Sequence, residues 1–264
     1  MHRAILNTLT TIKHILLFLV AVFTGHMHFA QPDKVVISFS DDIAENKPIH
    51  ESRVPVLRRS PDRTFILPVS LILYGFSSTG NKNENWGSMD IALKNHVQRN
   101  NPAFHTRVDD HLQYAPVVLV YLLNATGVKG KHDLRDRTMI CLLSGAFTFT
   151  FVKTIKSVMK EERPDTQAPT SFPSGHTALA FSSAYFLHQE YKQQSPWYGV
   201  AGYTMAAGTG MLRILNNRHW LKDVVAGAGF GILSGQLAYL LYPKIKQWLF
   251  GEKKQQGMAM AISY

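Results

Sequence analysis

The chain has 264 residues, 45% of them hydrophobic and 17% charged, which is enough for one domain and excludes a disordered, collagen-like or low-complexity protein. Its only cysteine, Cys141, excludes an intramolecular disulfide framework and a Cys-based zinc site. The net charge of +10 favours anionic partners such as phosphate esters or lipid headgroups, whereas the lack of any run of five Lys or Arg residues argues against nucleic acid.

The N-terminal segment has the pattern of a secretory signal peptide. Two basic residues, Arg3 and Lys13, precede the compact apolar stretch Ile15–Phe23, and smaller residues follow it. We predict a signal peptide over residues 1–30, with an uncleaved signal anchor as the alternative, and either one implies export. Residues 31–63 are polar and interrupted by proline, so we expect a linker there.

Residues 64–250 have a helical apolar pattern, and we predict one all-α domain there, followed by a polar tail over residues 251–264. An amphipathic helix is expected over Trp86–Val97. The apolar helices are expected at Phe65–Phe76, Ala115–Ala125, Met139–Val152, Thr177–Leu187, Trp197–Leu215 and Val224–Tyr242.

The lengths of the apolar stretches favour a bundle that is associated with a membrane or partly inserted in one. A membrane span needs about 20 apolar residues, and Val224–Pro243 meets that length without a charged residue. Met139–Val152 and Trp197–Leu212 are marginal, whereas Phe65–Phe76 and Ala115–Ala125 are too short. The alternative is a soluble bundle whose apolar helices are buried.

Two polar clusters in the second half of the chain have features of an anion site. Lys156 and Arg163 are seven residues apart, which predicts two cations on one helix face before Pro164 ends the helix. Pro173-Ser174-Gly175-His176 precedes an apolar helix, and free N–H groups at a helix N-terminus bind anions. Taken separately, the first cluster is more typical of a solvated basic face, and the second of an ordinary serine N-cap followed by an exposed histidine.

A third cluster holds His219 and Asp223, which are neighbours if this stretch is helical. The carboxylate then accepts the Nδ1 proton of the imidazole and leaves Nε2 with a free lone pair. Arg213, six residues before His219, offers a further fork of donors for phosphate. A surface His–Asp pair is the alternative for this cluster.

Together the three clusters resemble the signature of the type 2 phosphatidic acid phosphatase and vanadium haloperoxidase superfamily, which reads Lys-x6-Arg-Pro, Pro-Ser-Gly-His and Ser-Arg-x5-His-x3-Asp. Every charged and catalytic position is matched between Lys156 and Asp223. The chain departs from the signature at Leu212, which stands in place of the serine, and in the short loop between Pro164 and Pro173. The resemblance implies an all-α helical bundle of the acid phosphatase and vanadium haloperoxidase type, with about six core helices.

The resemblance also implies a phosphatase that needs no metal and no cofactor. His219 is then the nucleophile that forms a phosphohistidine, Asp223 orients it, and His176 is the general acid. The residues expected to bind the phosphoryl oxygens are Lys156, Arg163, Ser174, Gly175 and Arg213.

Members of the superfamily that resemble this chain act on lipid phosphates, so the expected partners are a phosphorylated lipid and a membrane. Lipid A phosphate is the first expectation, before undecaprenyl diphosphate and phosphatidic acid. The export signal predicts a place in the cell envelope, with the site facing the periplasm or the outer surface. The alternatives are a soluble periplasmic acid phosphatase of broad specificity and a catalytically silent lipid-binding membrane protein.

Overall fold

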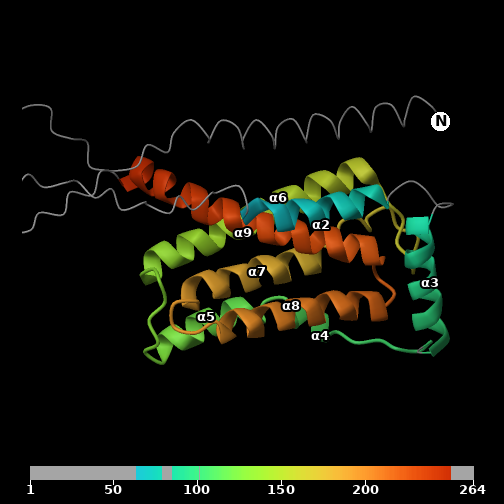
Figure 1. The fold of residues 1–264 in the computed structure, drawn as a ribbon, viewed down its shortest axis with the longest axis horizontal. Coiled ribbons are helices and arrows are strands. Elements are labelled where there is room, and N and C mark those ends of the chain that lie inside the picture. The colour runs from blue at the N-terminus through green and yellow to red at the C-terminus, as the bar shows by residue number, and fades with distance from the viewer. Residues whose placement is uncertain (1–63, 79–84, 101, 251–264) are drawn as a thin grey trace, which may run out of the picture. The chain divides into compact units, whose positions relative to one another are not determined.

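The chain folds into a bundle of α-helices (Figure 1). A computed structural model describes residues 64–78, 85–100 and 102–250, and these ranges contain eight helices and no strand. The helices are α2 (Ile66–Ser77), α3 (Asn85–Asn100), α4 (Val108–Leu112), α5 (Ala115–Ala125), α6 (Leu134–Met159), α7 (Gly175–Tyr191), α8 (Trp197–Leu215) and α9 (Leu221–Phe250). The predicted all-α fold is confirmed, while the predicted signal peptide, linker and tail lie outside the described residues.

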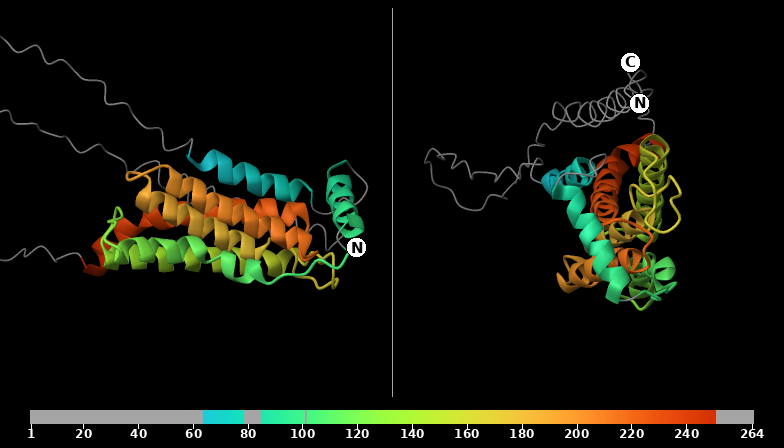
Figure 2. Two further views of the ribbon diagram at one scale, coloured as in Figure 1. Left: turned by 90° about the horizontal axis from the view of Figure 1, so that it is seen from below. Right: turned by 90° about the vertical axis from the view of Figure 1, so that its right-hand side faces the viewer.

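Helix α7 lies at the centre of the bundle and contacts α5, α6, α8 and α9 along its length. Helix α2 packs on α9, and α3 runs across one end of the bundle in all three ribbon views (Figures 1 and 2). The N-terminus of α7 and the C-terminus of α8 lie at that same end. The fold therefore brings the Pro173–His176 cluster, at the start of α7, and the Arg213–Asp223 cluster, at the end of α8, to one end of the bundle.

A stripe of glycines lets α7 and α9 approach closely. Gly227, Gly231 and Gly235 are four residues apart and so share one face of α9. A Cβ atom added at Gly231 would lie 2.1 Å from the carbonyl oxygen of Ala178 in α7, and one added at Gly227 would lie 2.6 Å from that of Ser174. The close packing sets the register of the two helices and carries the start of α9 against the start of α7.

Helices α6 and α9 are long and apolar enough to cross a membrane, by length and composition alone. The apolar window of α9 is 67% buried inside the bundle, and that of α6 only 28%. The outer face of α6 accordingly exposes Leu142 and Phe149. Helices α2 and α5 are apolar but short, as the sequence predicts.

The predicted helix ends agree best with the structure where helix-breaking residues such as proline stand next to them. The structure begins and ends α5 and α8 at the predicted residues, whereas α6 is longer than predicted at both ends. Helix α9 continues past Pro243 to Phe250, although a proline removes one backbone donor from the helix. The short helix α4, with only five residues, was not predicted from the sequence.

Candidate active site

His219 lies in the turn between α8 and α9, and Asp223 lies in the first turn of α9. The Nδ1 atom of His219 is 3.4 Å from Oδ2 of Asp223, and that oxygen also accepts bonds from the backbone N–H of Trp220 at 2.9 Å and from the hydroxyl of Ser171. The sequence predicts that the two residues are neighbours if they share a helix, but α9 begins only at Leu221. The two side chains still meet because the carboxylate reaches back over the N-terminus of α9.

The environment of His219 keeps its imidazole neutral. The ring is almost completely buried, and burial is the main cause that lowers its pKa well below the usual value. The neighbouring charges that lower the pKa further belong to Lys156, Arg163, Arg213 and His176. With Nδ1 directed at Asp223, the other ring nitrogen, Nε2, keeps a lone pair for a nucleophilic or basic role.

Lys156 and Arg163 reach the site from different elements, so the prediction that they share one helix face is wrong. Helix α6 ends at Met159, where Lys160 takes up the left-handed conformation with φ 48°. Arg163 therefore lies in the loop after the helix. The loop, rather than one further helical turn, brings its guanidinium to the site.

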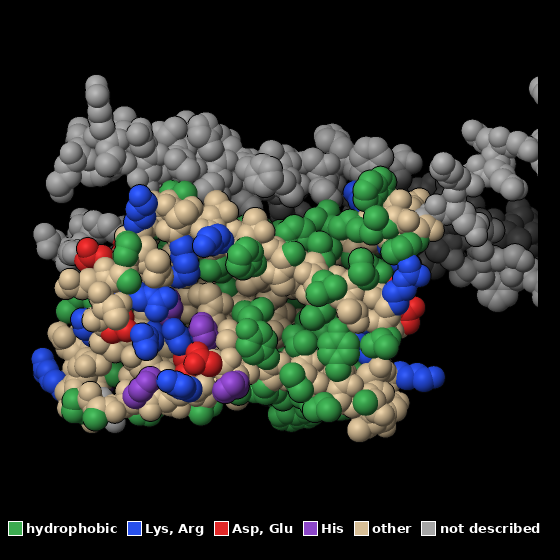
Figure 3. Space-filling view, turned by 180° about the vertical axis from the view of Figure 1, so that it is seen from behind, with side chains coloured by type: hydrophobic (Ala, Val, Ile, Leu, Met, Phe, Trp, Pro, Cys, Tyr) green, Lys and Arg blue, Asp and Glu red, His purple; other side chains and the backbone are tan. Residues whose placement is uncertain are grey.

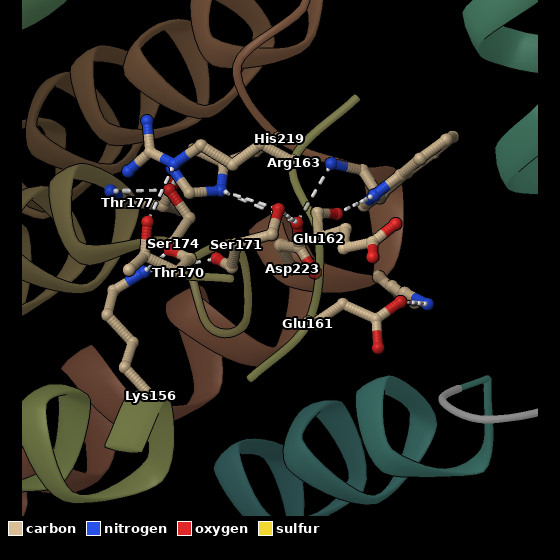
Figure 4. A network of polar contacts seen from close by, with 12 residues as sticks. Lys156, Glu161, Glu162, Arg163, Thr170, Ser171, Ser174, Thr177, His219 and Asp223 are labelled. Atoms are coloured by element: carbon tan, nitrogen blue, oxygen red, sulfur yellow. Dashed lines mark hydrogen bonds and ion pairs between the residues drawn. The ribbon is translucent and has the colours of Figure 1, made fainter. Parts of the chain in front are cut away.

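The loop between α6 and α7 is bound to both cations (Figure 4). The Nζ atom of Lys156 donates to the carbonyl of Thr170 and, at 3.1 Å, to that of Ser171. Nε of Arg163 donates to the hydroxyl of Thr170 at 3.2 Å, and Phe172 anchors the loop in the core, where it is fully buried. These bonds hold the two cations beside His219 while leaving several of their N–H groups for a ligand.

The start of α7 brings Ser174, Gly175 and His176 to the same place. Ser174 is the N-cap, because its hydroxyl oxygen accepts bonds from the N–H of Thr177 at 3.4 Å and from the hydroxyl of Thr177 at 2.9 Å. The backbone N–H of Ser174 donates to the carbonyl of Asp223 at 2.9 Å. The serine is thus both an N-cap and, with its own hydroxyl proton, a donor in reach of the site.

Helix α4 contributes two acids that the sequence interpretation missed. Oδ1 of Asp110 lies 2.9 Å from Nε2 of His176. Oδ2 of Asp109 accepts a bond from Nη1 of Arg213 at 2.5 Å, and its Oδ1 accepts one from the Asn216 amide at 3.1 Å. His176 and Arg213, the two motif residues that contact α4, are therefore each paired with a carboxylate of that helix.

A cavity of about 190 Å³ opens between these elements. Its walls include three of the predicted site residues, Arg163, His176 and Arg213. The remaining lining residues are His105, Thr106, Arg107, Asp110, Asn216 and Arg218. On the face of the molecule drawn in Figure 3, many Lys, Arg and His side chains gather at one end together with a few acidic ones, and hydrophobic side chains are spread over the rest. The cavity is therefore a cationic pocket that suits an anion.

The structure thus brings all eight predicted site residues to one end of the bundle, and adds Asp109, Asp110, Asn216 and Ser171. No local pattern in the sequence links Asp109 with Arg213, which is 104 residues further on. Within the described ranges, no three His, Cys, Asp or Glu side chains are grouped so that they could hold a metal ion.

Comparisons with known proteins give the following matches. A family model described as the PAP2 superfamily matches residues 64–247. Lipid A 1-phosphatase of Porphyromonas gingivalis is 43% identical over 169 residues, which cover 61% of this chain and 38% of that protein. The chain therefore spans little more than a third of the length of this curated relative.

Two crystal structures are also similar. The transmembrane PAP2 type phosphatidylglycerolphosphate phosphatase from Bacillus subtilis aligns with a TM-score of 0.49 at 20% identity, over 69% of this chain and 98% of that chain. LpxE of Aquifex aeolicus aligns with a TM-score of 0.42 at 25% identity, over 55% of this chain and 93% of that chain.

Proposed function

Because this chain belongs to the PAP2 superfamily, we propose that it is a lipid phosphatase and that it acts on a phosphate of lipid A. The match over residues 64–247 includes all three sequence clusters and confirms the resemblance predicted from them. One observation carries the proposal, namely that Arg163, His176 and Arg213 from separate elements line one cavity at the end of the bundle where Asp223 contacts the buried ring of His219. Fixed positive charge around a neutral imidazole is suited to binding a phosphoryl group and stabilising its transfer.

In the first step of the proposed reaction, Nε2 of His219 attacks phosphorus and the bond to the lipid oxygen breaks. His176 gives its proton to the leaving oxygen, so the lipid leaves as a neutral alcohol, and Asp223 stabilises the charge on the phosphorylated imidazole. The groups that hold the phosphoryl oxygens belong to Lys156, Arg163, Ser174, Gly175 and Arg213.

In the second step, water attacks the phosphohistidine. Neutral His176 takes a proton from this water, the bond between nitrogen and phosphorus breaks, and inorganic phosphate leaves. His219 is again neutral and His176 is again protonated, so the cycle closes. The positive charges remain in place through both steps, because charge on the phosphoryl oxygens must be stabilised in each transition state.

Two features favour a lipid substrate. The named relative at 43% identity is a lipid A 1-phosphatase, and lipid A phosphate is accordingly the first choice. Apolar side chains are also exposed on α5, α6 and α8, including Val118, Leu142, Phe149 and Met211. An exposed apolar surface of this kind is typical of contact with a membrane or with acyl chains.

We further propose that the protein resides in the cell envelope and that the cationic cavity faces the periplasm or the outer surface. The support is the N-terminal signal pattern in the sequence, together with the two helices, α6 and α9, that are long enough to cross a membrane. Protease accessibility of a tag placed after residue 250, in intact and in opened cells, tests this orientation.

A substrate panel tests the proposed function. The detergent-purified protein is given lipid A, undecaprenyl diphosphate, phosphatidic acid and p-nitrophenyl phosphate at equal concentrations, and released phosphate is measured. We expect the highest rate with lipid A. A soluble phosphatase of broad specificity would instead leave the membrane fraction without detergent and hydrolyse the nitrophenyl ester as fast as any lipid. A catalytically silent protein would release no phosphate from any of the four.

The pH dependence of kcat/KM follows from the two imidazoles. His219 must be neutral, so activity rises with pH through its pKa, which burial and the nearby cations hold well below the usual value of about 6.5. His176 must be protonated, so activity falls as pH passes its pKa, which burial and Arg213 also lower. We therefore expect a bell-shaped profile with its maximum on the acidic side of about pH 6.5.

Initial rates with phosphatidic acid in detergent micelles between about pH 4 and pH 8 measure this profile, since its alkoxide needs the proton of His176 and kcat/KM reports the free enzyme. The kcat profile should lie at higher pH, because a bound phosphate dianion favours the protonated form of both imidazoles. A flat kcat/KM profile across this range would contradict the assignment of the two histidines.

A further inference from the structure

Helix α4 places two adjacent carboxylates against two different motifs. Asp109 is fully buried and pairs with Arg213, while Asp110, on the next residue, is exposed and lies 2.9 Å from Nε2 of His176. Asp110 is also 3.8 Å from Nη1 of Arg213 and lines the cationic cavity. Neither acid belongs to the three motifs, and Asp110 has no part in the reaction as proposed so far.

The backbone position of Asp110 is fixed by hydrogen bonds that neighbouring residues make to the end of α8. The segment before α4 is bound to the end of α8 by two reciprocal bonds, from the N–H of Thr106 to the Asn216 amide oxygen at 2.9 Å and from the Asn216 amide nitrogen to the Thr106 carbonyl at 3.0 Å. The buried bond between Asp109 and Arg213 adds a third attachment. The carboxylate of Asp110 is therefore held in place for His176 before any substrate binds.

We propose that Asp110 is a positioning residue for His176, which holds the imidazole at Nε2 and stabilises the protonated form needed for departure of the lipid alcohol. This role rests on the proposed phosphatase function. With Nε2–H donated to Asp110, the ring nitrogen that serves the substrate is Nδ1. Protonated His176 then gives the Nδ1 proton to the leaving oxygen, and in the second step Nδ1 takes a proton from water, while the Nε2–H bond to Asp110 persists.

The charges around His176 support this role. Arg213 from α8 acts against the protonated form, as does burial, which is the larger cause that lowers the His176 pKa. The positive guanidinium of Arg163 lines the same cavity as His176, and the neutral imidazole of His219 lies in the turn between α8 and α9. Asp110 and, more weakly, Asp109 act in the opposite direction. The bond to His176 lowers the pKa of Asp110, which keeps its carboxylate ionised.

The variant Asp110→Asn tests the proposal with two substrates that differ in leaving group. Phosphatidic acid needs a proton on its alkoxide, whereas nitrophenolate leaves without one. We expect kcat/KM, which reports the steps up to departure of the leaving group, to fall about 10–100-fold for phosphatidic acid and less than about 3-fold for p-nitrophenyl phosphate. The descending limb of the phosphatidic acid profile should move to lower pH, because the protonated imidazole has lost its counter-charge.

The ratio of the two rates is measured within one preparation, so a smaller folded fraction does not change it. Asp165→Asn is the matched control, since it removes the same charge from the partner of Arg218 without a contact to His176. Asp110→Glu should restore part of the rate with phosphatidic acid. Equal losses for both substrates with an unmoved descending limb would overturn the role of Asp110 while leaving the phosphatase function intact. A wild-type protein that releases no phosphate would overturn both.

Discussion

His219→Ala should lower kcat by at least about 10⁴-fold while the protein stays folded. The variant removes the atom that attacks phosphorus, and no other imidazole in the site has a lone pair prepared by a buried carboxylate as Asp223 prepares Nε2 of His219. The loss should appear with every substrate, including p-nitrophenyl phosphate, because the nucleophile is needed whatever the leaving group. Phosphate release and thermal unfolding of the same preparation measure the two effects.

The matched control is His96→Ala, which removes an exposed imidazole whose hydrogen bond is to Asn100 in its own helix. We expect this variant to keep the wild-type rate. Rapid acid-free quenching with ³²P-labelled substrate should trap a base-stable, acid-labile phosphoryl group on the wild-type protein and none on His219→Ala. Normal turnover in His219→Ala would show that the nucleophile is another group.

The helices could be predicted wherever the sequence contains both an apolar pattern and a helix-breaking residue at its end. Pro196 and the Asn216-Asn217 pair delimit α8, and its predicted ends agree with the structure. Helix α4 was missed because five residues are too few to show a 3.6-residue period. Helix α9 exceeds its prediction because its last turns contact the start of α6, where Lys246 pairs with Asp136 and Arg135 lies over the ring of Phe250. The local propensity of a single proline does not reveal such tertiary contacts.

The site was predictable where its geometry is local, and unpredictable where it depends on tertiary contacts. The pairing of His219 with Asp223 follows from a spacing of four residues, and it survives although His219 precedes the helix. The prediction for Arg163 was wrong because a left-handed residue at Lys160 ends α6 early, which helix periodicity does not reveal. Asp109 and Asp110 come from a helix that lies more than 60 residues away in sequence from the groups they bind, so no motif spacing predicts them.

Asp109→Ala should destabilise the protein by about 3–5 kcal/mol, because it leaves the buried Arg213 guanidinium with only the longer contact to the exposed Asp110 at 3.8 Å. Asp109 is fully buried, and Nε of Arg213 already has no hydrogen-bond partner among the described residues, so the site offers little compensation. For a domain of this size the loss corresponds to a fall in Tm of about 6–20 °C. Activity should fall about 10²–10³-fold, since Arg213 is then no longer held at the phosphoryl position. Thermal unfolding in detergent and phosphate release measure the two losses.

The double variant Asp109→Ala/Arg213→Ala separates stability from catalysis. Removing both charges removes the uncompensated cation, so the double variant should regain most of the Tm lost by Asp109→Ala while remaining as inactive as Arg213→Ala alone. Lys246→Ala is the control, because the half-exposed Lys246 pairs with Asp136 away from the cavity, Asp136 keeps its bond from the Tyr242 hydroxyl, and an ion pair of that kind contributes at most about 1 kcal/mol. A double variant no more stable than Asp109→Ala would mean that the carboxylate stabilises α4 by itself, through Asn216, and not by balancing the charge of Arg213.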